Sequence, residues 1–234
     1  MKNATGGIYH ILNRGVDKRK IFLDNGDYLR FIHDLFEFND EDKVLNVGHF
    51  FSQNQYIDVR RQYIGGRPHK RRKMLVEISA FCLMPNHYHL LLQPIVPGGI
   101  SLFMKKLNGG YAKYFNFKYE RAGTLFQSRY KSILVKRDAH FIHIPYYIHA
   151  NPLDLIEPRW REKNVKDYKK AFRFLENYRW SSHPDYLGKE KFPSVTQRRL
   201  LLDFFGGASA YRRSFANWLK NLDLAATGHL TLEQ

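Results

Sequence analysis

The chain has 234 residues, of which 44% are hydrophobic, and it carries a formal net charge of +16. The apolar content is sufficient for a buried core, and the charge favours a polyanionic partner such as a nucleic acid. The single cysteine, Cys82, excludes an intramolecular disulfide and a zinc site built on several cysteines.

The start of the chain lacks an apolar signal segment, and no apolar run approaches the roughly 20 residues that a membrane helix needs. We therefore expect a cytoplasmic protein without a membrane partner.

The N-terminal part predicts a strand, a helix and an insertion. Residues 7–15, GIYHILNRG, are typical of a strand that ends in a glycine turn. Apolar residues recur at helical spacing in residues 24–40, which predicts an amphipathic helix. Residues 41–73 include the stretch 59–73, which has seven Lys or Arg and no acid. Because glycines and a proline interrupt this stretch, we predict an inserted basic hairpin or loop.

The middle of the chain predicts the remaining strands of a sheet. The expected elements are strands at 73–85 and 86–94, a helix at 100–121, a turn and a strand within 123–137, and a short helix at 138–152. The resulting order, β-α-β-β-α-β, predicts an α+β fold of the ferredoxin-like, split βαβ type, with an antiparallel sheet and helices on one face. We place a first domain at 1–152 and a helical C-terminal extension at 153–234, with amphipathic pieces at 197–207 and 210–222.

Two histidines lie in the most hydrophobic predicted strand. Residues two apart face the same side of a strand and are roughly 6.5 Å apart, so His87 and His89 point together while Tyr88 points away. Converging imidazoles make half of a metal site. The alternative is a pair of core histidines, each with a hydrogen-bond partner.

The predicted helix at 138–152 offers further ligands. Tyr147 and Asn151 are four residues apart and share one helical face, so a phenol and an amide oxygen could reach the histidine pair. Such a set suits Mg²⁺ or Mn²⁺. Tyr146 is an alternative to Tyr147, although it is turned by about 100° around the helix. Pro152 biases Asn151 away from helical geometry, so a water could take its place.

Four segments together resemble a known family. They are GIYHILNRG, FCLMPNHYHLLLQP, LNGGYAKYFNFKYERAGTLFQSRYKSILV and YYIHANPL, which run from about residue 7 to residue 153. In order and spacing they resemble the HUH single-tyrosine transposases of insertion sequences, and most closely the REP-associated tyrosine transposases.

The resemblance implies a function and a set of site residues. His87, His89 and Asn151 match the ligands of one divalent metal ion, and Tyr147 matches the nucleophile. Such enzymes cleave single-stranded DNA beside a folded hairpin, forming a 5′-phosphotyrosine and leaving a free 3′-hydroxyl. They occur as monomers or homodimers.

Basic residues mark a candidate DNA surface. Between residues 104 and 137 there are nine Lys or Arg and one acid, with interleaved aromatics that we assign mainly to the core. The candidate phosphate contacts are Lys105, Lys106, Lys113, Arg129 and Lys131, together with Arg14 and the basic stretch that contains Arg71 and Arg72. For that stretch, a solvated loop without contacts is an equally good interpretation.

Two other functions are compatible with these patterns. The ferredoxin-like fold also occurs in RNA-binding modules, which stack bases on aromatic side chains of the central strands. A metal-dependent nuclease could use water instead of the tyrosine. A covalent protein–DNA adduct distinguishes the transposase from both alternatives.

Overall fold

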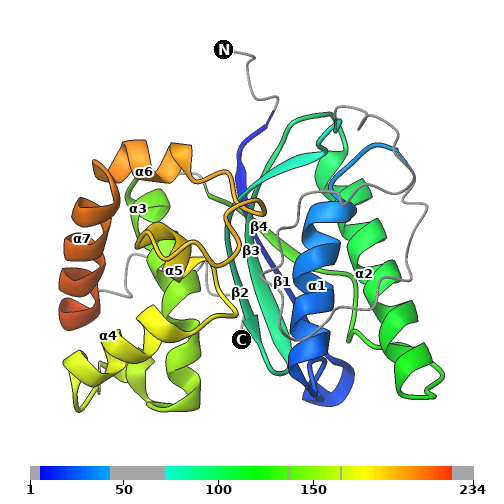
Figure 1. Ribbon diagram of the computed structural model, residues 1–234, viewed down its shortest axis with the longest axis horizontal. Coiled ribbons are helices and arrows are strands. Elements are labelled where there is room, and N and C mark those ends of the chain that lie inside the picture. The colour runs from blue at the N-terminus through cyan, green and yellow to red at the C-terminus, as the bar shows by residue number, and fades with distance from the viewer. Residues whose placement is uncertain (1–5, 43–71, 136–137, 164, 223–234) are drawn as a thin grey trace.

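The computed structural model describes residues 6–42, 72–135, 138–163 and 165–222 (Figure 1). Its centre is a four-stranded antiparallel sheet in the order β2-β3-β1-β4. The strands are β1 (Ile8–Arg14), β2 (Val76–Met84), β3 (His87–Pro94) and β4 (Lys131–Val135). This order is that of the ferredoxin-like sheet, so the predicted fold class is confirmed.

The first face of the sheet is covered by α1 (Asn25–Glu37) and α2 (Gly99–Lys118), as Figure 1 shows. Helix α1 begins at Asp24, whose carboxylate accepts a hydrogen bond from the Asp27 backbone N–H, while the Asp27 carboxylate accepts one from the Asp24 N–H. This reciprocal cap satisfies two backbone donors that a helix start otherwise leaves open. The apolar stripe predicted from the sequence faces the sheet and is buried.

The C-terminal part covers the opposite face, which makes the molecule three layers deep (Figure 1). Its helices are α3 (Asp138–Ala150), α4 (Tyr168–Asn177), α5 (His183–Tyr186), α6 (Arg199–Phe205) and α7 (Ala208–Asn221). Two short 3-10 turns also belong to this part, η2 (Asn151–Leu155) and η3 (Trp160–Glu162). A third, η1 (Val16–Lys18), follows β1. The helix predicted at 138–152 therefore ends at Ala150 and continues as the tighter turn η2, as expected for the residue before Pro152.

Strand β3 shows why both faces need cover. Tyr88, Leu90 and Leu92 point into the core beneath α1 and α2, whereas His89 and Leu91 point toward α3. All five are fully buried. An antiparallel sheet usually leaves one face to water, so this continuous burial requires a second helical layer.

The extension also covers the outer edge of the sheet. The N–H of Leu83 donates to the carbonyl of Trp180 at 2.8 Å, and the N–H of Ser182 donates to the carbonyl of Phe81 at 3.0 Å. Pairing of this kind removes the open edge of β2, which would otherwise be available to another chain. The division at residue 152 stays a prediction, and the predicted basic insertion lies mostly outside the described residues.

Among the described residues, no helix combines the length and the apolar character needed to span a membrane.

The two adjacent glycines of α2 give a test of this packing. A Cβ on Gly109 meets nothing within 4 Å, whereas a Cβ on Gly110 lies 2.4 Å from the ring of Phe38. We expect Gly109→Ala to raise the free energy of unfolding by about 0.5–1 kcal/mol, because alanine has less freedom in the unfolded chain. Gly110→Ala should lower it by about 1–3 kcal/mol through overpacking. Urea denaturation of both variants measures the free energy of unfolding. If both substitutions changed it in the same direction, the packing of Gly110 against Phe38 would be contradicted.

Two buried histidines, His149 of α3 and His183 of α5, share the hydroxyl of Tyr211 where α3 packs against the extension. The hydroxyl of Tyr211 is 2.6 Å from Nδ1 of His149 and 3.0 Å from Nδ1 of His183. Nε2 of His149 is 2.7 Å from Oγ of Ser182. Burial lowers the pKa of His149 to about 3 and holds the pKa of His183 well below its usual value. Both rings are therefore neutral in the folded protein near neutral pH.

This pair should make the protein sensitive to acid. In the unfolded chain both histidines titrate near about 6.5, so below that pH the unfolded state binds more protons than the folded state. We expect the free energy of unfolding to fall as the pH drops below about 6.5, by up to about 1.4 kcal/mol per pH unit for each histidine. Chemical denaturation across pH 4 to 7 measures the slope. His183→Asn should make it shallower; an unchanged slope would show that this ring is not responsible.

Candidate active site

The histidine pair of β3 faces α3. The ring centroids of His87 and His89 are 5.0 Å apart with the rings nearly perpendicular, and both side chains are buried. Tyr88 points to the other face, where its hydroxyl donates to Asn108 at 2.5 Å. The alternation predicted from the strand period is therefore present.

Each ring of the pair is oriented by a hydrogen bond at Nδ1. Nδ1 of His89 lies 2.9 Å from Nε2 of His10 on β1, and the two rings stack with centroids 5.1 Å apart. Nδ1 of His87 lies 2.7 Å from Oδ1 of Asn86 in the β2–β3 turn. Partners of this kind set ring orientation and tautomer in metal sites. The sequence pattern alone does not assign this contact to His10 or to Asn86.

Tyr147 of α3 lies against His89 and the partner of His89 on β1, His10. Its ring centroid is 6.0 Å from that of His89 and 6.2 Å from that of His10, edge-on in both cases. The ring is fully buried between the sheet and Trp160. Two distant parts of the sequence, the β3 strand and the α3 helix, therefore bring two imidazoles and a phenol together.

Tyr146 points away from this cluster. Its ring packs against Phe205, Tyr211, Phe215 and Trp218 in the core of the extension, and burial raises the pKa of its phenol. The helical turn of about 100° between neighbouring residues places the two tyrosines on different sides of α3. The geometry favours Tyr147 over Tyr146 as the residue next to the histidines.

Asn151 is close to the cluster, but its amide is engaged. Its Nδ2 donates to the backbone carbonyl of Tyr147 at 2.8 Å, and its Oδ1 accepts a hydrogen bond from Nη2 of Arg161 at 2.8 Å. Nη2 of Arg161 is also 3.5 Å from the hydroxyl of Tyr147. In the described part of the chain, no three His, Cys, Asp or Glu side chains gather closely enough to hold a metal ion. A third ligand would therefore be an amide or a water.

Arg161, Trp160 and Asp154 lie at the candidate site, and the sequence patterns do not reveal them. They lie in the extension, beyond the predicted first domain, in a segment without periodic spacing. The guanidinium of Arg161 forms an ion pair with Asp154, which also accepts a hydrogen bond from the Trp160 indole at 2.6 Å. Only the fold brings this group to the tyrosine.

Two predicted DNA contacts lie on the histidine face of the sheet. Arg14 is the cross-strand partner of His87, and Lys131 and His89 are both partners of Leu12 on β1. Residues directly opposite in an antiparallel pair project from the same face, so both basic side chains flank the histidine pair. Arg14 is half-buried and Lys131 is exposed.

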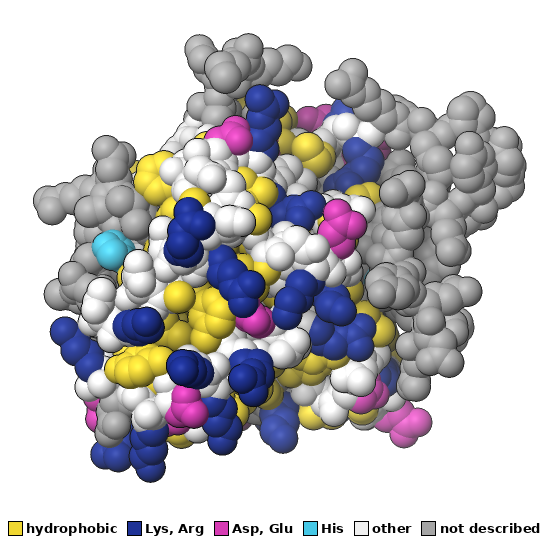
Figure 2. Space-filling model, turned by 60° about the vertical axis from the view of Figure 1, so that its left-hand side comes forward, with side chains coloured by type: hydrophobic (Ala, Val, Ile, Leu, Met, Phe, Trp, Pro, Cys, Tyr) yellow, Lys and Arg dark blue, Asp and Glu magenta, His cyan; other side chains and the backbone are white. Residues whose placement is uncertain are grey.

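The other predicted DNA contacts are dispersed. Lys105 and Lys113 are exposed on α2, in the layer on the far side of the sheet, and Arg129 is exposed just before β4. Arg72 donates to the carbonyls of Phe36 and Asn39 at the end of α1. Arg71 lies outside the described residues. The space-filling view of the C-terminal helices shows many further Lys and Arg side chains (Figure 2).

Comparison with known proteins relates the segment that carries the histidines and the tyrosine to a family of transposases. Residues 58–151 match the model of a family described as transposase, IS200-like. The matched segment includes both histidines of β3, Tyr147 and Asn151. The predicted resemblance to insertion-sequence transposases is confirmed for this segment, which makes up about two fifths of the chain.

A solved structure described as a REP-associated tyrosine transposase bound to a REP hairpin is similar to this chain, with 15% sequence identity and a TM-score of 0.48. The similarity covers 81% of this chain and 84% of that one. A search of curated proteins gave no match.

Adjacent lysines on α2 allow a structural contact to be separated from a surface charge. Nζ of Lys106 donates to the carbonyls of Asp40, Glu41 and Asp42 after the end of α1, whereas Lys105 is exposed. We expect Lys106→Met to lower the free energy of unfolding by about 1–2 kcal/mol, because these carbonyls lose a charged donor. Lys105→Met should change it by less than about 0.5 kcal/mol. Urea denaturation of both variants measures the free energy of unfolding. Equal changes in the two variants would exclude a structural role for Lys106.

Proposed function

We propose that this transposase cleaves and rejoins single-stranded DNA through a 5′-phosphotyrosine on Tyr147, with a divalent metal ion held by His87 and His89. The observation that carries the proposal is the position of the Tyr147 ring, 6.0 Å from His89, whereas the Tyr146 ring packs against Phe205. In the attack, the bond from the phenol oxygen to phosphorus forms as the bond from phosphorus to the 3′ oxygen breaks. The bond energy is conserved in the adduct, which permits rejoining.

The histidine pair fits a metal ion. His87 and His89 both use Nδ1 for an orienting hydrogen bond, with Asn86 and His10. With the proton on Nδ1, the Nε2 atom of each ring would be the one to bind the ion. Mn²⁺ accepts imidazole nitrogen together with oxygen ligands, whereas Mg²⁺ prefers oxygen. Asn151 would supply the amide oxygen once Arg161 has left it. When bound, the ion would polarise the scissile phosphate as a Lewis acid.

A single copy of the chain brings the proposed ligands and nucleophile together. His87, His89 and Tyr147 all come from one chain, and the ring contacts that link His87 to His89 and His89 to Tyr147 lie within it. This supports a monomer that is competent for cleavage, although a homodimer is compatible with it.

Single-stranded DNA with a hairpin is the proposed substrate. The net charge of +16 favours a polyanion, and Arg14 and Lys131 flank the histidines where a phosphate would pass. Lys105, Lys113 and Arg129 would contact phosphates further from the cut. The sequence motifs similar to REP-associated tyrosine transposases support the hairpin, and a cytoplasmic location is part of the same proposal.

The RNA-binding alternative is disfavoured by the layering. RNA-recognition domains stack bases on an open face of the sheet. Here the central strands β1 and β3 are covered by helices on one face and by α3 on the other, and their inward side chains are buried.

A covalent adduct tests the proposed function. The protein is incubated with a single-stranded hairpin oligonucleotide and Mn²⁺, and denaturing gels are examined for protein-linked DNA. We expect an adduct from the wild type and none from Tyr147→Phe, because the attacking oxygen is gone. Tyr146→Phe is the matched control and should keep the adduct. His89→Ala should reduce it by roughly a hundredfold or more, since the ion loses a ligand.

The same experiment can overturn the proposal. Cleavage that persists in Tyr147→Phe without an adduct would identify a nuclease that uses water. Adduct formation by Tyr147→Phe that is lost in Tyr146→Phe would move the nucleophile to the neighbouring tyrosine.

A further inference from the structure

Arg161 occupies the position at which the extension meets the candidate active site. Its Nη2 lies 2.8 Å from Oδ1 of Asn151 and 3.5 Å from the hydroxyl of Tyr147. The guanidinium carbon lies 5.5 Å from the centroid of the Tyr147 ring and 4.5 Å from that of Trp160. One side chain therefore touches both the proposed nucleophile and the proposed third ligand.

Two groups of the extension hold this guanidinium in place. Asp154 forms an ion pair with it and is itself fixed by the indole N–H of Trp160 at 2.6 Å. The side chains of Arg161 and Asp154 are only 27% and 28% exposed. An arginine that is held by a carboxylate and stacked on a ring is preorganised for a defined contact.

The contact with Asn151 conflicts with a metal ligand at the same atom. Oδ1 is the oxygen that a divalent ion would take, and in this structure it accepts a hydrogen bond from a permanently charged guanidinium. A divalent ion bound there would lie next to a like charge, which raises its free energy. Simultaneous contact of the ion and the guanidinium with this oxygen is therefore electrostatically unfavourable.

We propose that Arg161 is a further active-site residue of this transposase: its guanidinium occupies the third-ligand oxygen of Asn151 in the DNA-free protein, yields it when the divalent ion binds, and then contacts the scissile phosphate. This inference rests on the proposed function of Tyr147 and the histidine pair. Two oxygens of a phosphate accept parallel N–H bonds from a guanidinium, and the phosphate offsets the charge of the guanidinium. Binding of DNA would thus relieve the conflict between the two cations and stabilise developing charge on the phosphate.

The test measures metal binding and chemistry separately in the full-length protein. Mn²⁺ affinity without DNA is measured by electron paramagnetic resonance of the free ion, and adduct formation at saturating Mn²⁺ is timed with the hairpin oligonucleotide. We expect Arg161→Gln to bind Mn²⁺ roughly tenfold more tightly, because a competing cation is removed. The same variant should form the adduct roughly tenfold to a hundredfold more slowly, because the phosphate loses its guanidinium.

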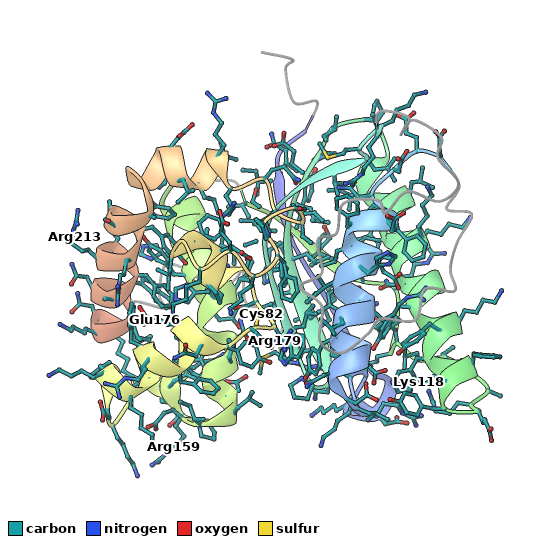
Figure 3. All side chains as sticks on the ribbon, viewed as in Figure 1. Cys82, Lys118, Arg159, Glu176, Arg179 and Arg213 are labelled. Atoms are coloured by element: carbon teal, nitrogen blue, oxygen red, sulfur yellow. The ribbon has the colours of Figure 1, made fainter. Side chains whose placement is uncertain are left out.

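Arg159→Gln is the matched control. Arg159 is exposed on the same segment, at the lower edge of the extension in Figure 3, and its loss changes the net charge by the same amount. The Mn²⁺ affinity and the rate of adduct formation of this variant should equal those of the wild type. Arg161→Met serves as a second variant that keeps the aliphatic stem on Trp160, and thermal unfolding confirms that each variant is folded.

A solely structural role for Arg161 would weaken Mn²⁺ binding and slow the reaction together, and that outcome overturns the proposal. Unchanged Mn²⁺ affinity overturns the competition for Asn151, and an unchanged adduct rate at saturating Mn²⁺ overturns the phosphate contact. If the wild type forms no adduct, the proposed function fails. The Mn²⁺ measurement still decides whether Arg161 competes for Asn151.

Discussion

The second face of the sheet is the part of the molecule on which the rest depends. Ala80, Cys82 and Leu91 on this face are fully buried, and His89 lies among them. Burying an imidazole in such a setting is costly unless it has a hydrogen-bond partner. His10 provides that partner, and α3 closes the face with Tyr147 above it. The same packing that completes the core therefore assembles the candidate site.

The extension is part of this core. Residues 180–197 hydrogen-bond along the edge of β2, and Arg161 reaches the proposed nucleophile from the same extension. A chain that ended at residue 152 would expose the edge of β2 and remove the hydrogen bond that Oδ1 of Asn151 accepts from Arg161. The family match ends at Asn151, so this chain combines an IS200-like segment with contacts that lie beyond it.

The basic side chains are distributed over the fold in a way that the amino-acid composition does not show. Arg14 and Lys131 lie on the histidine face, whereas Lys105 and Lys113 lie on α2 in the opposite layer. Arg72 and Lys106 are engaged with backbone carbonyls near the end of α1. Basic residues that are close together in the sequence therefore have different roles. Some can contact a phosphate near the proposed cleavage site, and others can contact phosphates far from it. The rest stabilise the fold.

The sequence by itself determined the local geometry of this protein. A period of two in β3 put His87 and His89 on one face, and Pro152 marked the end of the α-helix just before Asn151. Such patterns are readable because they depend on neighbours a few residues apart. Only the tertiary structure decided that His10 orients His89 across 79 positions of sequence, and that Arg161 reaches Asn151. These contacts follow from how buried faces pack against one another, and local spacing carries no record of that packing.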